Sequence, residues 1–466
     1  MLPGMDTKRG FKTAAAFTIT AILLHFANFL NSDEGFVLNG AWKMYQGQRI
    51  YEDFFSFIPP GSYLWTKWSF DLLGSSYWSA KLFSLLLLLA SVWAIYRISA
   101  EFTRRRDISL MIAWSWLILS FYGPSLIINH NTHSSYVLLV GLYATILAVK
   151  RRKASLFFVG GFLLGLVTFF LQTKGILVST ALLGLFLLYA FRKEIAWKEY
   201  GAFALGIFTL PLIMIAVWGG GTLYEHLIQW PSLHYPSVNR VSSIPFLFAF
   251  VIFGVLLALA LKKEFPRKIL WIIAVSQIAA FLSALTRPDI FHIFWNSFGI
   301  IVLLFPLGAD WLVTLRQRNI ISVWLFRSRD FYKITILFLI LPAVLLNAAM
   351  FFRHRAIVER LGAYQMGEFY SHPFMPGLYF ELQSSDPYPY AALLTGMFPE
   401  EAFMVNLRTL DFSKPQFVLL QKGIVEKFDY NWDNILDRYI QEHYREIDRV
   451  GTIKILRRTL PSNDYQ

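Results

Sequence analysis

The chain has 466 residues, of which 56% are hydrophobic and 16% are charged, and its mean hydropathy is +0.48. This composition is too apolar for an ordinary soluble domain and predicts a polytopic membrane protein. The formal net charge of +13 does not indicate nucleic-acid binding, because Lys and Arg occur in short runs between apolar segments. The absence of cysteine excludes disulfides, thiolate metal sites and a cysteine nucleophile.

Apolar runs long enough to cross a bilayer core of about 30 Å recur along most of the chain. The first run, 13–30, follows several basic residues, and we expect a retained helix there because no small-residue cleavage site comes after it. About eleven spans are predicted in all. The others lie near 79–98, 108–128, 134–149, 154–171, 175–191, 201–219, 244–261, 269–285, 295–313 and 334–352.

Lys and Arg are concentrated in alternate connecting segments, starting with the N-terminus, which predicts that the N-terminus is cytoplasmic. With an odd number of spans, the tail then lies on the outer side of the plasma (inner) membrane. We expect an all-α transmembrane domain over 1–352 and a small extracytoplasmic α/β domain over 353–466. In this tail, strand-like runs at 402–405, 417–420 and 452–456 alternate with a helical pattern at 432–444.

The first outer loop, 31–78, is unusually acidic for so apolar a chain. Asp33 and Glu34 follow the first apolar run directly, and Glu52 and Asp53 lie further along the loop. A helix is predicted to begin at Glu34 and to end at Gly47. A second is predicted between the Pro-Pro-Gly turn at 59–61 and Gly74. Both are expected to lie flat on the membrane, the second through an apolar face of Leu64, Trp65, Trp68 and Leu72.

Asp33 has two interpretations from the sequence. A carboxylate at the start of a helix is often a cap, but one at the mouth of a cavity removes a proton from an attacking hydroxyl or amine. Glu52 and Asp53 are candidates for substrate contact or for holding a metal.

The other predicted outer loops are short and place a cation or an imidazole at the membrane boundary. Lys174 is either an interfacial lysine whose ammonium reaches water or a phosphate ligand. Arg287 and His292 either pair locally with Asp289 or clamp a phosphate or diphosphate. These alternatives stay open from the sequence.

Histidines and aromatic residues mark two further loops. His130 and His133 either bind a metal together with a carboxylate or form hydrogen bonds at a helix end. Tyr224 and His234 lie in the loop 219–243, whose mixture of aromatic and polar residues suits carbohydrate or lipid headgroups and is equally typical of an aromatic belt.

The first loop resembles that of the GT-C superfamily of integral-membrane glycosyltransferases, and most of all its protein-mannosyltransferase and aminoarabinose-transferase branch. The resemblance is carried by Asp33-Glu34, by the segments 47–55 and 58–61, and by the Thr-Lys-Gly turn at 173–175. The tail is similar to the outer domain that ends many bacterial members, through 414–420, Tyr444 and 451–458.

This resemblance implies transfer of a sugar from a polyprenyl-phosphate donor to a lipid, glycan or protein acceptor on the outer face, with inversion. Asp33 would be the base, Glu34 its neighbour in the site and Lys174 a ligand of the donor phosphate. Members often have lysine before the Pro-Pro turn, where this chain has Ile58, so a second phosphate contact would fall to Arg287 or His292.

No cofactor is required for this chemistry, although a divalent metal is compatible with it. A phosphate leaving group needs cations more than a proton donor. The competing functions are a flippase or transporter of lipid-linked saccharides, and a ligase that uses a diphosphate-linked glycan. Transporters place their charged residues near the bilayer midplane, whereas those of this chain gather at one boundary.

Overall fold

A computed structural model of the chain describes residues 33–103, 106–119, 128–238, 242–285, 287–317, 341–423 and 425–459. The backbone falls into two compact units. Unit 1 takes the described parts of 84–217 and 241–349, and unit 2 takes those of 27–83, 218–240 and 350–466. The described part of the loop 31–78 and most of the C-terminal region therefore belong to the same unit. The division into domains at residue 352 stays a prediction.

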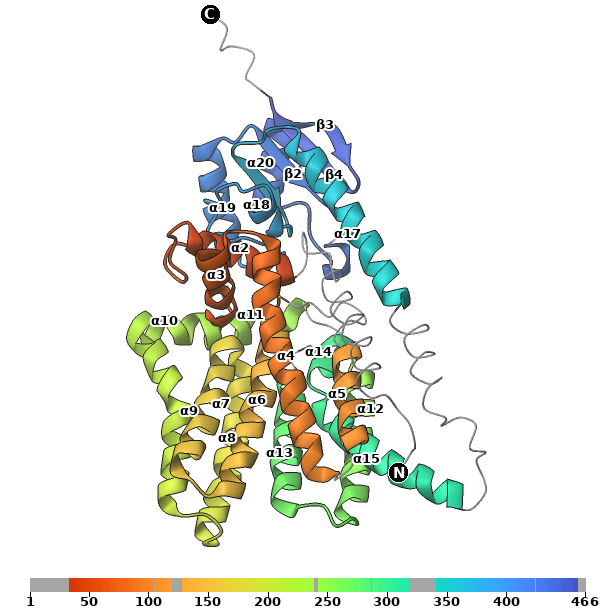
Figure 1. The fold of residues 1–466 in the computed structure, drawn as a ribbon. Helices are drawn as coiled ribbons and strands as arrows, with labels where there is room; N and C mark the ends of the chain where they lie inside the picture. The colour runs from red at the N-terminus through yellow and green to blue at the C-terminus, as the bar shows by residue number, and fades with distance from the viewer. Residues whose placement is uncertain are drawn as a thin grey trace, which may run out of the picture. The chain divides into compact units, whose positions relative to one another are not determined.

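The described part of unit 1 is helical (Figure 1). The predicted run 13–30 and much of 334–352 fall outside the described residues. The helices are most of α4 (Tyr77–Phe102), α5 (Arg106–Leu119), α6 (His130–Arg151), α7 (Ala154–Phe170), α8 (Gln172–Phe191), α9 (Trp197–Trp218), α12 (Ile244–Leu261), α13 (Arg267–Ser283), α14 (Ile290–Trp295), α15 (Phe298–Gln317) and the start of α17 (Leu341–Gly362).

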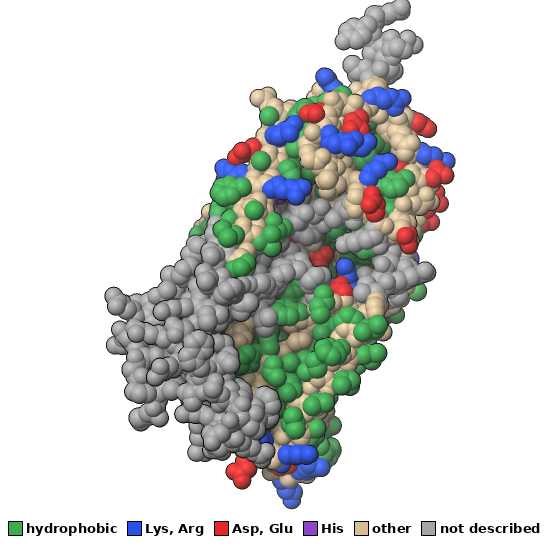
Figure 2. All heavy atoms as spheres, turned by 90° about the vertical axis from the view of Figure 1, so that its right-hand side faces the viewer, with side chains coloured by type: hydrophobic (Ala, Val, Ile, Leu, Met, Phe, Trp, Pro, Cys, Tyr) green, Lys and Arg blue, Asp and Glu red, His purple; other side chains and the backbone are tan. Residues whose placement is uncertain are grey.

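Among the described residues, 5 helices are long and apolar enough to cross a membrane, namely α4, α6, α8, α9 and α12. Shorter apolar helices occur at Ile108–Leu117, Ala154–Phe170 and Phe298–Gly308. Large apolar side chains such as Leu212 and Phe248 are more than half exposed on these helices, as lipid-facing residues are. On the face drawn in Figure 2, hydrophobic side chains gather over the lower part of the described surface. The prediction of a mostly helical, multi-span membrane protein is confirmed.

Glycines allow α7 and α9 to pack closely. A Cβ atom on Gly161 would lie 2.1 Å from the carbonyl oxygen of Phe203, and one on Gly206 would lie 2.3 Å from that of Phe158. Any larger residue would push the two backbones apart. Small residues at helix contacts are the usual way for membrane helices to gain packing contacts.

Unit 2 contains α2 (Asp33–Tyr45) and α3 (Gly61–Leu73), so both helices predicted in the first loop are present. A helix lying flat on the membrane would leave its polar side open to water, and α2 does not have this arrangement. Polar Asn39 and Lys43 are fully buried along with the apolar residues of α2. On α3 the predicted apolar face is largely open, since Trp68 is 48% and Leu72 is 72% exposed. That exposure fits contact with lipid.

The C-terminal part of unit 2 has a sheet of four strands in the order β1-β2-β4-β3 (Figure 1). The first pair is parallel and the other two are antiparallel. The elements of the rest of unit 2 are β1 (Phe369–His372), β2 (Phe417–Leu420), β3 (Tyr444–Val450), β4 (Ile453–Arg458), α10 (Gly220–Tyr224), a π-helix (Glu225–Gln229), α11 (Trp230–Val238), α18 (Gly377–Glu381), α19 (Glu400–Ser413), a short 3-10 helix (Glu426–Phe428) and α20 (Ile435–His443).

The predicted helix at 432–444 and the strands at 417–420 and 452–456 correspond to α20, β2 and β4. The strand predicted at 402–405 is wrong, because these residues lie in α19. Its buried residues Ala402, Phe403, Asn406 and Leu410 follow the period of a helix. Every residue of β1 and β2 is buried, so both faces of the sheet are covered there.

Candidate functional site

The turn before α3 has an internal network of hydrogen bonds. The hydroxyls of Tyr51 and Ser56 each donate to the carbonyl of Ile58 at 3.0 Å, and the amide of Ile58 donates back to Ser56 at 3.2 Å. The Ser56 hydroxyl also lies 3.1 Å from the hydroxyl of Tyr63 on α3. This network fixes the Pro-Pro turn against α3.

Asp33 is the first residue of α2 and is half-buried. Burial raises the pKa of Tyr63, and the negative charge of Asp33 raises it further, which places the two side chains within electrostatic reach of each other. The candidate base therefore lies near the turn that carries the family-like segment 58–61.

Glu34, in contrast, is fully buried. It accepts a hydrogen bond of 3.2 Å from the hydroxyl of Tyr77, and its charge acts on the ammonium of Lys81. Lys81 is itself 2% exposed, and its ammonium lies over the rings of Tyr77 and Trp78 at 5.6 and 5.4 Å. Adjacent carboxylates in such different environments are suited to different tasks. Lys81 was not selected from the sequence, although a lysine early in an apolar span is a signal of a functional residue.

Lys174, in unit 1, is fully buried at the start of α8. Its ammonium donates to the carbonyl of Asn131 at 3.1 Å and to the hydroxyls of Ser134 and Ser135 at 2.9 and 2.6 Å. These contacts engage all the N–H donors that a lysine has. A phosphate at this position would have to replace one of them.

Arg287 and His292 both bond Asp289. The Arg287 Nε donates to Asp289 Oδ2 at 2.9 Å, and the His292 Nδ1 lies 2.8 Å from Asp289 Oδ1. Burial opposes ionisation of Asp289, but the hydrogen bonds and charge of His292 and the charge of Arg287 outweigh it and lower its pKa to about 2. The structure thus contains the local pair that the sequence allowed, and a phosphate role stays a prediction.

His130 and His133 lie at the start of α6, in the same turns as the residues that Lys174 bonds. The Nε2 atom of His133 is 2.8 Å from the hydroxyl of Ser84. The Nε2 atom of His130 is 3.1 Å from the side-chain nitrogen Nδ2 of Asn131. Helix α14, which carries His292, packs against α6. Unit 1 therefore brings Lys174 and the two histidines together at the start of α6, and packs the helix of His292 against α6.

The remaining predicted residues are more exposed. Glu52 and Asp53 flank the guanidinium of Arg49, which is 2.7 Å from the first and 3.9 Å from the second. Tyr224 is 59% exposed, and the ring of His234 packs against Trp230 with their centroids 5.3 Å apart. Among the residues that the structure describes, no group of three or more His, Asp or Glu side chains is arranged to hold a metal.

A segment far along the chain supports the first loop. The indole of Trp42 donates to the carbonyl of Ser384 at 2.8 Å, and Asn39 donates to Asp386 at 2.7 Å. The ammonium of Lys43 lies 3.1 Å from Asp386 and donates to the carbonyl of Tyr388 at 2.5 Å. Sequence patterns gave no indication of this segment, which buries the polar residues of α2.

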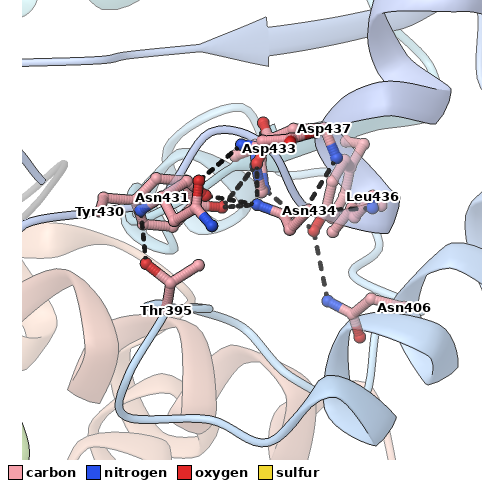
Figure 3. Close-up of polar contacts among 10 residues, drawn as sticks. Thr395, Asn406, Tyr430, Asn431, Asp433, Asn434, Leu436 and Asp437 are labelled. Atoms are coloured by element: carbon pink, nitrogen blue, oxygen red, sulfur yellow. Dashed lines mark hydrogen bonds and ion pairs between the residues drawn. The ribbon is translucent and has the colours of Figure 1, made fainter.

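A second polar cluster, shown in part in Figure 3, lies around the start of α20. Asn434 caps the helix by accepting from the amides of Leu436 and Asp437 at 3.1 and 3.0 Å. Asp437 accepts from the hydroxyl of Tyr430 at 2.9 Å and lies 3.1 Å from the imidazole of His372 on β1. His372 is fully buried, so this cluster joins β1 to α20 and is structural.

The chain was compared with protein families, curated proteins and solved structures. Residues 58–218 match the family model described as dolichyl-phosphate-mannose-protein mannosyltransferase. No curated protein matches the sequence. The chain is similar to the crystal structure of ArnT from Cupriavidus metallidurans bound to undecaprenyl phosphate, with a TM-score of 0.61, 12% identity and coverage of 97% of both chains. For ArnT in the apo state the TM-score is 0.58, with the same identity and coverage.

At this identity the likeness to ArnT shows a shared fold. The family match covers part of the chain, from Ile58 in the Pro-Pro turn to Trp218 at the end of α9. Residues 58–218 of this chain are thus similar to the dolichyl-phosphate-mannose-protein mannosyltransferase family, and the whole chain has a fold like that of ArnT.

Proposed function

We propose that this glycosyltransferase moves a sugar from a polyprenyl-phosphate donor to a lipid, glycan or protein acceptor, with Asp33 as general base. The observation that carries the proposal is the contrast between the adjacent carboxylates of α2. Glu34 is fully buried and engaged with Tyr77, whereas Asp33 is half-buried at the start of the helix. An acceptor can therefore approach Asp33 more easily than Glu34.

In the proposed reaction, Asp33 takes the proton from the acceptor hydroxyl as its oxygen attacks the anomeric carbon of the donor. The bond from that carbon to the phosphate oxygen breaks on the opposite side, so one displacement inverts the configuration. The polyprenyl phosphate leaves with the bonding electrons, and cations stabilise its charge. Lys174, Arg287 and His292 are proposed for that role.

The topology belongs to the same proposal. The alternation of basic segments supports a cytoplasmic N-terminus and an outer first loop, and about eleven spans would then place the C-terminal domain outside the plasma membrane. The donor phosphate and the acceptor would meet at that outer face. The undecaprenyl phosphate bound to ArnT, which shares this fold, supports a carrier of that chemical class.

The test uses purified full-length protein in lipid nanodiscs with radiolabelled polyprenyl-phosphate sugars and a membrane extract as the source of acceptors. Asp33→Asn is expected to lower the transfer rate by about 10²–10⁴-fold, the usual contribution of a general base. Asp71→Asn is the matched control, because Asp71 lies on α3 of the same unit and pairs at the surface with Lys67 at 2.6 Å.

Full activity of Asp33→Asn would remove Asp33 from the mechanism. Absence of transfer from every monophosphate donor would favour a diphosphate-dependent ligase, and movement of the lipid-linked sugar between leaflets without transfer would favour a flippase.

A further inference from the structure

Three segments of unit 2 bring a group of aromatic side chains together. We define the aromatic cluster as Phe55, Phe57, His226, Trp230, Tyr390 and Phe398, all of which are half-buried. Trp230 lies at its centre, with ring centroids 4.9 Å from Phe55, 5.1 Å from Phe57 and 4.9 Å from Phe398. The rings of Phe57 and Trp230 are stacked. The three segments are the turn before α3, the π-helix with α11, and the stretch that leads into α19.

His226 gives this cluster a polar edge. It lies in the π-helix, a rare form that is frequent at functional sites. Its Nδ1 lies 3.1 Å from the carbonyl of Ser56, which only accepts, so Nδ1 carries the proton and Nε2 is an acceptor in the neutral ring. Burial lowers the pKa of His226, which favours this neutral form.

The cluster is connected to the candidate base within the same unit. His226 bonds the backbone of Ser56, whose hydroxyl lies 3.1 Å from that of Tyr63. Tyr63 in turn is within reach of the charge of Asp33. The ring of Phe57 in the cluster also lies 6.1 Å from that of Phe36, three residues after Asp33 on α2, so a ligand held against Trp230 would lie near the start of α2.

The chemistry of the cluster indicates the class of ligand. None of its six members is Lys or Arg, and the charge of Glu225 acts on Tyr390, so an anionic headgroup is disfavoured. Partly exposed rings with a few hydrogen-bonding groups at their edges present an apolar body and a polar rim, the combination that a neutral sugar ring also has. Lipid tails cannot form hydrogen bonds with the imidazole of His226 or the phenol of Tyr390.

We infer that the aromatic cluster is a saccharide-binding subsite that holds a neutral sugar ring of the acceptor beside Asp33. This inference rests on the proposed function, in which an acceptor hydroxyl has to reach that carboxylate. It narrows the acceptor from any lipid, glycan or protein to one that carries a sugar, and it assigns the segment 219–243 a part in acceptor choice.

The experiment is saturation-transfer difference NMR on full-length protein in nanodiscs, with chitotriose, maltotriose and galactobiose as probes. We expect saturation transfer to at least one probe, about tenfold weaker binding in Trp230→Leu, and recovery in Trp230→Phe, which keeps a ring. Trp197→Leu is the control, since Trp197 is an exposed tryptophan at the start of α9 in the other unit.

Equal signals from Trp230→Leu and the unchanged protein, or no signal from any probe, would overturn the inference. Asp33→Asn separates the two proposals, because it is expected to bind the probe normally. If the probe binds through Trp230 but no polyprenyl-phosphate sugar is ever transferred, the subsite stands and the proposed function fails.

Discussion

Replacing Asp386 with asparagine tests whether the C-terminal region holds the first loop in place. In the structure, the side chains of Lys43 and Asp386 are 1% and 0% exposed and lie 3.1 Å apart. Asp386 also accepts from the side chain of Asn39 at 2.7 Å and from the amide of Tyr388 at 3.1 Å. Asp386→Asn keeps the shape and an acceptor oxygen, but it removes the buried carboxylate that pairs with the ammonium of Lys43.

Removing one partner of a buried ion pair costs about 3–5 kcal/mol of the free energy of unfolding. For a domain of about 150–250 residues each kcal/mol corresponds to about 2–4 °C, so the Tm should fall by about 6–20 °C. The double variant Lys43→Met, Asp386→Asn removes both charges and should recover most of that loss. The Tm is measured by intrinsic fluorescence during heating in detergent.

The pH dependence gives a second measurement on the same variants. Burial lowers the pKa of Lys43 from 10.5, and Asp386 opposes that effect, so the pKa falls further in Asp386→Asn. The unfolded chain then binds more protons than the folded one between this lowered pKa and 10.5, and stability rises with pH across that window. The defect of Asp386→Asn should therefore shrink as pH rises toward 10. A Tm loss below about 2 °C at pH 7, or a double variant less stable than the single one, would refute the reasoning.

Two other carboxylates give predictions of a different kind. Burial opposes ionisation of Asp437, but His372 and the hydrogen bonds of Tyr430 and Asn434 outweigh it and hold the pKa of Asp437 below its usual 3.8. The ionised carboxylate therefore stabilises the fold above about pH 4, and this contribution is lost as the pH falls through the lowered pKa. The Tm difference between Asp437→Asn and the unchanged protein should therefore shrink as the pH falls below about 4, and a constant difference would contradict this. Asp289→Asn should raise KM for the donor and leave that for the acceptor unchanged, because Arg287 and His292 lose the carboxylate that holds them. Initial rates at varied donor concentration measure this, and an unaltered donor KM would remove the pair from phosphate binding.

The sequence predicted the elements that depend on local patterns. Gly74, with a φ of +85°, ends α3 as expected, and apolar runs such as 244–261 coincide with helices. The run 402–405 was misassigned because a short apolar stretch fits a strand as well as a helix. Pro399 followed by Glu400 and Glu401 is a helix start that would have corrected it.

The supporting contacts of the candidate site had no local signal. Lys43 has no pattern that links it to Asp386, since the pairing depends on the fold of unit 2. His226 in its π-helix and Lys81 beside Glu34 are likewise fixed by tertiary packing. Asp33 and Glu34 were selected together from the sequence. Only the fold shows that Glu34 is fully buried and that Asp33 is half-buried.

The pairing of α2 with the segment around Asp386 also affects how the protein is made. Asn39 and Asp386 are 347 positions apart, so at roughly 5–20 residues per second the ribosome needs between about 17 and 70 seconds to supply the partner. During that time Asn39, Trp42 and Lys43 lack the groups that they bond in the finished fold. The first loop would therefore complete its fold only after the tail is synthesised. A chain that stops before residue 386 would lack the carboxylate that pairs with Lys43. Such incompletely folded chains are degraded by cellular proteases.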